Sequence, residues 1–345
     1  MENSSFPQNL TLWHPTSGPT APTEDEILEL PLVIILCTVL GVASVLGTLG
    51  NSLVLLSIIK FDTLRAIPDL FIFSLSLSDF LVTALYQPLS AYRFAHWQQA
   101  STNVVFLVIT SFLGHFSLIA SITNMFGVTV ERLISIRFPL KYDLLVTTRR
   151  AIVTVICIWI FSITYGAIWS RGLVSEKYLA IYFILVLIGT VSIYFYIFLI
   201  TKRLEDSVVQ VQNESTDVER PNIRRERKAA KTIAIILGVA VVCWLPLLIV
   251  PQVLGKDVDR ATFLKVFNSL HVLSVCNCSI NPYIYCVRSR RYSVAFVNLL
   301  GLQRVVKVQA TVAPAYSPRN PALNAGDRPP QEIQSLQGEI NDVSL

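Results

Sequence analysis

The chain has 345 residues, 53% of them hydrophobic and 15% charged, and it carries a formal net charge of +5. Because soluble domains average about 25% charged residues, this composition and a mean hydropathy of +0.57 exclude an ordinary soluble domain and indicate a membrane protein. The positive charge is interpreted as attraction to anionic membrane lipids, and nucleic acid is not a predicted partner.

Seven stretches of the chain are long and apolar enough to cross a bilayer, which requires about 20 mostly apolar residues. They cover residues 30–59, 70–92, 102–130, 151–170, 178–201, 232–254 and 262–287. The predicted fold class is therefore an all-α membrane protein, a seven-transmembrane helix bundle. The bundle forms one domain over 30–301, between an extracellular tail over 1–29 and a disordered cytoplasmic tail over 302–345.

The segment "RSRRYSVAFVNLLG", residues 288–301, has a basic beginning and an apolar face at Phe296, Leu299 and Leu300. This combination predicts a short amphipathic eighth helix that lies along the membrane surface. The tail that follows has no cysteine, so a palmitoyl anchor is not expected there.

Lysine and arginine are concentrated in the segments after the first, third, fifth and seventh spans. The segments after the second, fourth and sixth spans carry only Arg93, Arg171, Lys177, Lys256, Arg260 and Lys265. Basic residues mark the cytoplasmic side, so we expect a multi-pass plasma-membrane protein with its N-terminus outside. Asn3 and Asn9 then lie in extracellular glycosylation sequons. The six cysteines fall inside spans or at their inner ends, so no disulfide is predicted.

Asp79 places a carboxylate in the middle of the second span, where an ionisable group is costly and is a functional hypothesis by default. Ser121, Asn277 and Asn281 lie at compatible depths in other spans. One carboxylate among hydroxyl and amide groups suits a small hard cation. A polar network that only holds the helices together is an equally good interpretation.

Two prolines interrupt predicted spans, Pro246 in the sixth and Pro282 in the seventh. Each removes one backbone hydrogen bond and makes a natural hinge. Trp244 stands just before the first of them, although a tryptophan in an apolar helix is usually a packing residue when taken alone. The sixth and seventh spans are therefore the ones predicted to bend.

Six short motifs stand in six of the spans and in a fixed order. They are GN at 50–51, LSLSD at 75–79, ERL at 131–133, Trp159, CWLP at 243–246 and NPYIY at 281–285. Together they resemble the motifs of the rhodopsin-like (class A) G-protein-coupled receptors over residues 30–301. The resemblance implies a receptor that is not an enzyme and that has no cofactor besides an allosteric sodium ion, held by Asp79, Ser121, Asn277 and Asn281.

The resemblance also implies a switch at the cytoplasmic face, where a heterotrimeric G protein inserts its C-terminal helix between the spans. In such receptors an acid on the sixth span holds the arginine of the third, and Glu226 is the candidate partner of Arg132. The alternative is that Glu226 is one charge in a solvated loop. The predicted coupling and switch residues are Glu131, Arg132, Leu140, Glu226, Trp244, Pro246, Pro282 and Tyr285.

The ligand pocket is expected in the outer halves of spans three, five, six and seven. Its predicted residues are Ser111, Gly114, His115, Leu118, Tyr178, Tyr182, Trp244, Leu247, Leu248, Asn268, His271 and Ser274. This lining holds no carboxylate, and Gly114 stands where amine receptors carry an aspartate, so an amine ligand is not expected. Val275 replaces the retinal lysine of opsins, which excludes a Schiff base. His115 and His271 are interpreted either as ligand-binding or pH-sensing groups or as histidines bonded to a neighbour.

Features of the outer half resemble one part of the family. Leu107 replaces the usual cysteine of the third span, the loop "RGLVSEK" is short, and the fifth span has no proline. These features are similar to the melanocortin, cannabinoid, lysophospholipid and adenosine receptor cluster. The expected ligand is an extracellular small molecule, lipid or short peptide. A ligand-independent or modulatory receptor partner and an ion-coupled membrane transporter are the alternatives.

Overall fold

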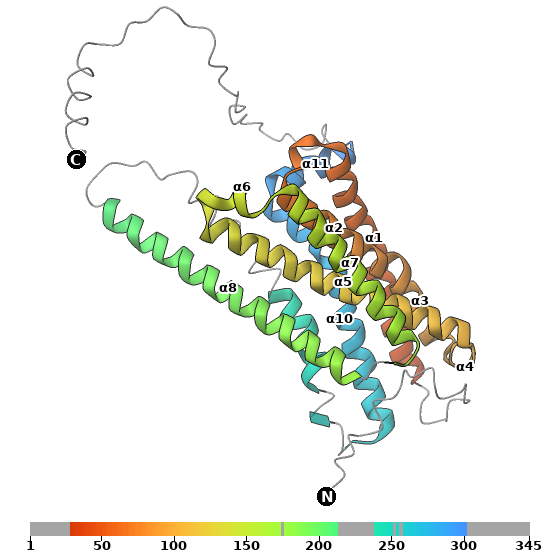
Figure 1. The fold of residues 1–345 in the computed structure, drawn as a ribbon. Helices are drawn as coiled ribbons and strands as arrows, with labels where there is room; N and C mark the ends of the chain where they lie inside the picture. Colours follow the sequence, from red (N-terminus) through yellow and green to blue (C-terminus); the bar gives the residue numbers. More distant parts are fainter. Residues whose placement is uncertain (1–27, 174–175, 213–237, 251–252, 255–257, 302–345) are drawn as a thin grey trace, which may run out of the picture. The chain divides into compact units, whose positions relative to one another are not determined.

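The computed structural model describes residues 28–173, 176–212, 238–250, 253–254 and 258–301. Within these residues every regular element is helical (Figure 1). The predictions made for the two tails, for Glu226 and for the sequons at Asn3 and Asn9 fall outside the described residues and stay predictions.

The long helices follow the predicted spans in order. They are α1 (Leu30–Lys60), α2 (Ile67–Leu81) continued by η4 (Val82–Tyr86) and α3 (Gln87–Ala95), α5 (Val104–Arg137), α7 (Thr148–Ser170), α8 (Glu176–Gln212), the helix Gly238–Val250 and α10 (Arg260–Arg288). Six of these runs are long and apolar enough to cross a membrane, and Gly238–Val250 is a shorter apolar helix inside the predicted sixth span. The prediction of a helical membrane bundle is confirmed.

Shorter helices connect or flank the spans. They are η3 (Asp62–Leu64), α4 (Trp97–Thr102), η5 (Pro139–Lys141), α6 (Tyr142–Leu145) and α11 (Arg290–Leu299). We call the end of the bundle that carries α6 and α11 the inner end. α5 and α8 extend beyond their predicted spans at this end, because helical hydrogen bonding continues after the apolar run has finished.

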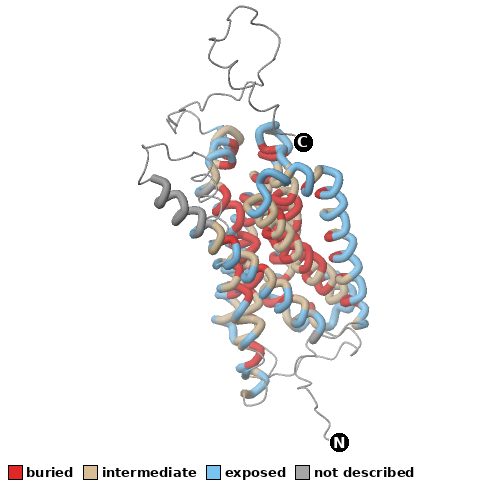
Figure 2. Tube along the Cα trace, turned by 60° about the vertical axis from the view of Figure 1, so that its left-hand side comes forward, coloured by how far each residue is buried: buried red, intermediate tan, exposed pale blue. Residues whose placement is uncertain are grey.

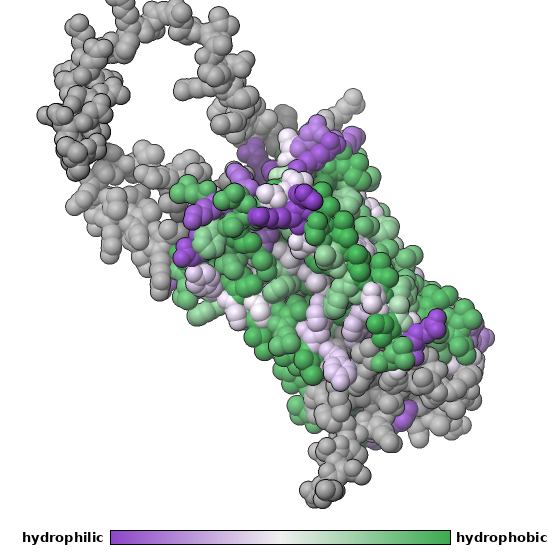
Figure 3. Space-filling view, viewed as in Figure 1, coloured by the Kyte–Doolittle hydropathy of each residue, from purple (hydrophilic) through white to green (hydrophobic). Residues whose placement is uncertain are grey.

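Apolar side chains cover the outside of the bundle as well as its interior. Figure 2 shows buried residues on the inward sides of the helices, and Figure 3 shows a hydrophobic flank with hydrophilic side chains gathered near α6 and α11. In the most apolar stretch of α1, 17% of the residues are buried, whereas in the most apolar stretch of α5, 56% are buried. Exposed apolar surface of this extent marks contact with a membrane, so α1 is peripheral and α5 central.

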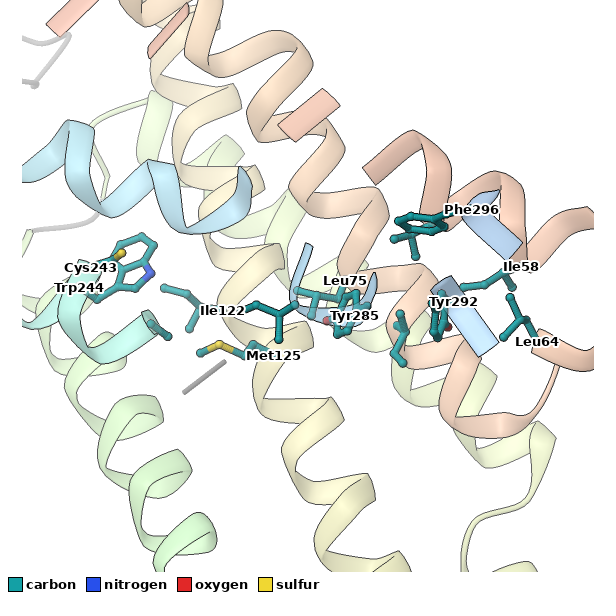
Figure 4. Close-up of a cluster of buried hydrophobic side chains, with 14 of the residues drawn as sticks. Ile58, Leu64, Leu75, Ile122, Met125, Cys243, Trp244, Tyr285, Tyr292 and Phe296 are labelled. Atoms are coloured by element: carbon teal, nitrogen blue, oxygen red, sulfur yellow. The ribbon is translucent and has the colours of Figure 1, made fainter. Parts of the chain in front are cut away.

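One apolar cluster links the central helices (Figure 4). Its labelled residues are Ile58, Leu64, Leu75, Ile122, Met125, Cys243, Trp244, Tyr285, Tyr292 and Phe296. The cluster connects the helix Gly238–Val250 with α2, α5, α10 and α11. Because protein interiors are close-packed, a displacement of one of these helices requires repacking of the others.

The crossing of α5 and α7 depends on Gly166. A Cβ atom at this position would lie 2.8 Å from Cβ and 3.1 Å from Cα of Phe116. Overpacking of this kind costs about 1–3 kcal/mol, so Gly166→Ala is expected to lower the Tm of the detergent-solubilised full-length protein. Gly41→Ala is the matched control, because a Cβ atom at Gly41 meets nothing within 4 Å. Equal Tm values for the two variants would contradict this packing.

Candidate functional site

Asp79 lies at the centre of the bundle and is fully buried. Its Oδ1 accepts a hydrogen bond from the Ser121 hydroxyl of α5 at 2.6 Å, and its Oδ2 accepts one from Asn281 Nδ2 of α10 at 2.8 Å. The Cys278 Sγ lies 3.6 Å from the Ser121 hydroxyl oxygen. The structure therefore joins three of the four predicted sodium ligands, which come from α2, α5 and α10.

The amide oxygens around this centre bear on whether a cation fits. Asn277 Oδ1, Asn281 Oδ1 and Asn51 Oδ1 are buried and have no hydrogen-bond partner among the described residues. Among the described residues, no direct hydrogen bond joins Asn277 to Asp79. Asn277 stands one helical turn before Asn281 on α10. A carboxylate, a hydroxyl and unpartnered amide oxygens are the ligands that a hard cation prefers, so the residues present fit a sodium ion.

A second polar chain fixes α2, α5 and α7 together. Trp159 Nε1 donates to the Ser74 hydroxyl oxygen at 2.9 Å, and the Ser74 hydroxyl donates to Asn124 Oδ1 at 2.7 Å. Asn124 is completely buried. Buried polar groups that are satisfied in this way hold helices in one register, which gives Trp159 a structural role.

The inner end of α5 carries two of the predicted switch residues, Glu131 and Arg132. Arg132 Nε lies 3.4 Å from Oε2 of its neighbour Glu131, whose side chain is only 2% exposed. The other oxygen of Glu131 accepts a hydrogen bond from the Tyr142 hydroxyl of α6 at 2.6 Å. Burial and the adjacent Glu131 raise the pKa of Tyr142, so this hydroxyl is a neutral donor. The sequence did not predict a role for Tyr142, which stands in the inner-loop segment "RFPLKYDLL" at 137–145, two residues after Leu140.

The loop between α5 and α7 presents apolar side chains at the inner end. Leu140 is fully exposed, and Leu144 is 72% exposed. Leu140 was predicted as an apolar contact for a partner protein, and its exposure makes it available for such a contact.

The remaining switch residues lie inside the helices. The Trp244 ring packs against the Phe183 ring with centroids 4.9 Å apart. Pro282 lies inside α10 and packs so closely on Gly50 that a Cβ atom there would lie 2.9 Å from Pro282 Cβ. Tyr285 is buried, and its hydroxyl has no partner among the described residues.

Tyr86 closes the outer side of the bundle in a way that the sequence did not predict. A Cβ atom at Gly114 would lie 2.6 Å from Cε2 of the Tyr86 ring. The Tyr86 hydroxyl shares a hydrogen bond of 2.8 Å with His271 Nε2. Tyr86 thus fills the space over Gly114 and links η4 to α10.

His115 has a different environment. Its Nδ1 lies 2.8 Å from the Ser111 carbonyl oxygen, which can only accept, so Nδ1 carries the proton. Its ring stacks on Trp169 of α7 with centroids 4.3 Å apart. Both predicted histidines, His115 and His271, are therefore hydrogen-bonded to a neighbour. Both lie in the outer half of the bundle.

The other predicted pocket residues differ in burial. Leu118, Tyr182, Leu247 and Leu248 are half-buried, and Asn268 and Ser274 are buried and bonded to carbonyl oxygens of their own helix. Tyr178 is 64% exposed, so the expectation that it faces inward is not met. It lies in the first turn of α8.

The six cysteines, all of which the structure describes, are free thiols.

The bundle spans a membrane, and its buried polar centre lies between an outer aromatic site and an inner Arg–Glu pair. This is the architecture of a transmembrane receptor.

Comparison with known proteins gives the same result. Residues 50–177 and 167–285 match the family described as 7 transmembrane receptor (rhodopsin family). The alpha-1A adrenergic receptor of Rattus norvegicus is 26% identical over 99% of this chain and 79% of its own length. The human alpha-1A adrenergic receptor is 26% identical over 90% and 75%, and trace amine-associated receptor 13c of Danio rerio is 28% identical over 72% and 80%.

The chain belongs to the rhodopsin family of 7 transmembrane receptors. It is a multi-pass G-protein-coupled receptor that binds an extracellular ligand, signals through a G protein and catalyses no reaction of its own.

Proposed function

We propose that this receptor responds to a ligand without an ammonium group, although similar proteins are named adrenergic and trace amine receptors. The observation that carries the proposal is the packing of the Tyr86 ring over Gly114. An ammonium ligand requires a nearby opposite charge when it leaves water. Gly114 supplies no charge, and a carboxylate at this position would collide with Tyr86.

Two acids at the outer end, Glu29 and Asp259, are engaged in other contacts. Glu29 pairs with Lys265 at 2.6 Å, and Asp259 accepts from the backbone N–H and the hydroxyl of Thr262, both at 2.8 Å. These hydrogen bonds lower the pKa of Asp259, which keeps it ionised at its place before α10. These contacts do not bring Glu29 or Asp259 to Tyr86 or His271.

The buried polar groups of the outer half favour a ligand with hydrogen-bond acceptors. The Ser111 hydroxyl, the Tyr165 hydroxyl and Trp169 Nε1 are buried and have no partner among the described residues. Tyr165 and Trp169 stand one turn apart on α7, and Trp169 stacks on His115. An unsatisfied buried donor costs about 1–3 kcal/mol. A carbonyl-bearing aromatic ligand would recover part of that cost.

The proposal also includes a bound sodium ion, a plasma-membrane location with the N-terminus outside, and membership of one receptor cluster. The sodium ion is supported by the oxygen groups around Asp79. A plasma-membrane location with the N-terminus outside is supported by the distribution of Lys and Arg. Membership of the melanocortin, cannabinoid, lysophospholipid and adenosine cluster is supported by α8, a helix without proline from Glu176 to Gln212, and by Leu107 in place of a cysteine.

The ligand proposal is tested with amine probes. Cells that display the full-length receptor are expected to show no G-protein dissociation with tyramine or noradrenaline, across a panel of Gα subtypes, because no carboxylate pairs with the ammonium group. Cells with the human alpha-1A adrenergic receptor, treated with noradrenaline, are the positive control. A saturable response of this receptor to either amine would contradict the proposal.

A further inference from the structure

Asp69, at the beginning of α2, is a buried carboxylate at the inner end of the bundle. Its side chain is 2% exposed. Arg291 Nη2 of α11 donates to both of its oxygens at 2.6 Å, and the Tyr292 hydroxyl donates to Oδ1 at 3.0 Å. The backbone N–H of Ala66 donates to Oδ2 at 3.2 Å. The carboxylate is thus satisfied by two side chains of one short helix.

The position of α11 depends on this carboxylate. Its N-cap residue Ser289 makes no side-chain capping hydrogen bond, and its first turn begins with Arg290 and Arg291. Positive charge at a helix N-terminus is unfavourable, and the ion pair with Asp69 offsets the charge of Arg291. Burial and the neighbouring carboxylate raise the pKa of Tyr292, which keeps its hydroxyl a donor.

Tyr292 connects the carboxylate to the switch residue Tyr285. Tyr292 is 2% exposed, and its ring lies 5.9 Å from the Tyr285 ring. In Figure 4 Tyr292 stands between Tyr285 and the pair Ile58 and Leu64. The Tyr285 hydroxyl has no partner among the described residues. Packing against Tyr292, and not a hydrogen bond of its own, therefore contributes to holding Tyr285 in this place.

We propose that Asp69, Arg291 and Tyr292 form a latch that holds the inner end of α10, so that Asp69 is a positioning residue for Tyr285. In this structure Arg132 is paired with its own neighbour Glu131. Loosening the latch frees Tyr285 and shifts the receptor toward the signalling state. The latch adds to the proposed function a contact between α2 and α11 that restrains activation.

The first test measures the latch without a G protein. Cys286, next to Tyr285 on α10, is a half-buried thiol, and the exposed thiol of Cys157 on α7 is an internal reference. Purified full-length receptor is treated with N-ethylmaleimide, and labelling of each cysteine is followed by mass spectrometry. In Arg291→Gln, labelling of Cys286 relative to Cys157 is expected to be about threefold faster, as for a shift of a two-state population. Unchanged labelling overturns the proposal.

Three further variants separate the latch from a loss of folding. Arg291→Lys keeps the charge and should label close to the wild-type rate. Tyr292→Phe keeps the ring and removes only the hydroxyl, so it should fold and show a smaller increase. Asp62→Asn removes an exposed acid that pairs with Arg65 and is the matched control. An increase with Asp62→Asn equal to that of Arg291→Gln would overturn the assignment.

The second test measures output per receptor. Basal G-protein dissociation, divided by surface receptor number, is expected to rise about twofold or more in Arg291→Gln and to return toward wild type in Arg291→Lys. A purely structural role predicts fewer receptors at the surface with the same output from each, and that result overturns the positioning role. A wild-type receptor that engages no Gα subtype would count against the G-protein assignment, whereas the labelling result decides the latch independently.

Discussion

Asp79→Asn is expected to abolish the sodium dependence of the receptor's thermal stability. Asp79 accepts hydrogen bonds from Ser121 and Asn281 and supplies the negative charge at the centre of the bundle. A ligand at ten times its Kd stabilises the folded state by about 1.4 kcal/mol. The Tm of the wild-type receptor should therefore rise by a few degrees when sodium chloride replaces N-methylglucamine chloride at equal ionic strength.

The matched control for this prediction is Ser117→Ala. Ser117 stands one turn before Ser121 on α5, is buried, and bonds only to carbonyl oxygens of its own helix. This variant should keep the sodium effect. A sodium-dependent Tm in Asp79→Asn, or a wild-type Tm that is the same in both salts, would mean that the polar centre only joins helices.

The sequence predicted the spans and the polar centre because both depend on local signals. An apolar run of sufficient length identifies a spanning helix, and Asp79, Ser121 and Asn281 each interrupt such a run at the same depth. Depth is enough to place these groups near one another when the helices all cross the same bilayer. The structure then shows Asp79 bonded to two of the three predicted partners.

Contacts between segments that are far apart in the chain could not be predicted in this way. Asp69 and Arg291 are separated by 222 positions; Asp69 stands just before the predicted second span and Arg291 in the predicted eighth helix. Tyr86 contacts His271 across 185 positions. A single sequence gives no information on which distant side chains meet. The predicted apolar face of α11 contained Phe296, Leu299 and Leu300; Phe296 is buried together with Tyr292 and Ala295, whereas Leu300 is 54% exposed.

The predicted partner of Arg132 at the inner switch stays a prediction. The prediction gave Arg132 a distant partner, Glu226, which lies outside the described residues. The structure pairs Arg132 with the adjacent Glu131 and gives the second oxygen of Glu131 to Tyr142. The family resemblance predicted an acid on the sixth span as the partner of Arg132. It did not predict the tyrosine on the short inner helix α6.

Arg132→Ala is expected to remove most G-protein coupling. The Arg132 side chain is 25% exposed at the inner end, and its contact with Glu131 is long at 3.4 Å. Its guanidinium group, which has five donors in a planar fork, can therefore reach a G-protein helix at low cost. Loss of such a buried interface contact typically costs 2 kcal/mol or more, which corresponds to a decrease of about 30-fold.

The assignment of the inner end as the coupling site is tested by G-protein dissociation in cells, across a panel of Gα subtypes, for the wild-type receptor and Arg132→Ala at equal surface expression. We expect at least one subtype to respond to the wild-type receptor and Arg132→Ala to reduce this response to the level of cells without receptor. Equal responses from the two proteins would contradict the assignment of Arg132 and of the inner end as the coupling site.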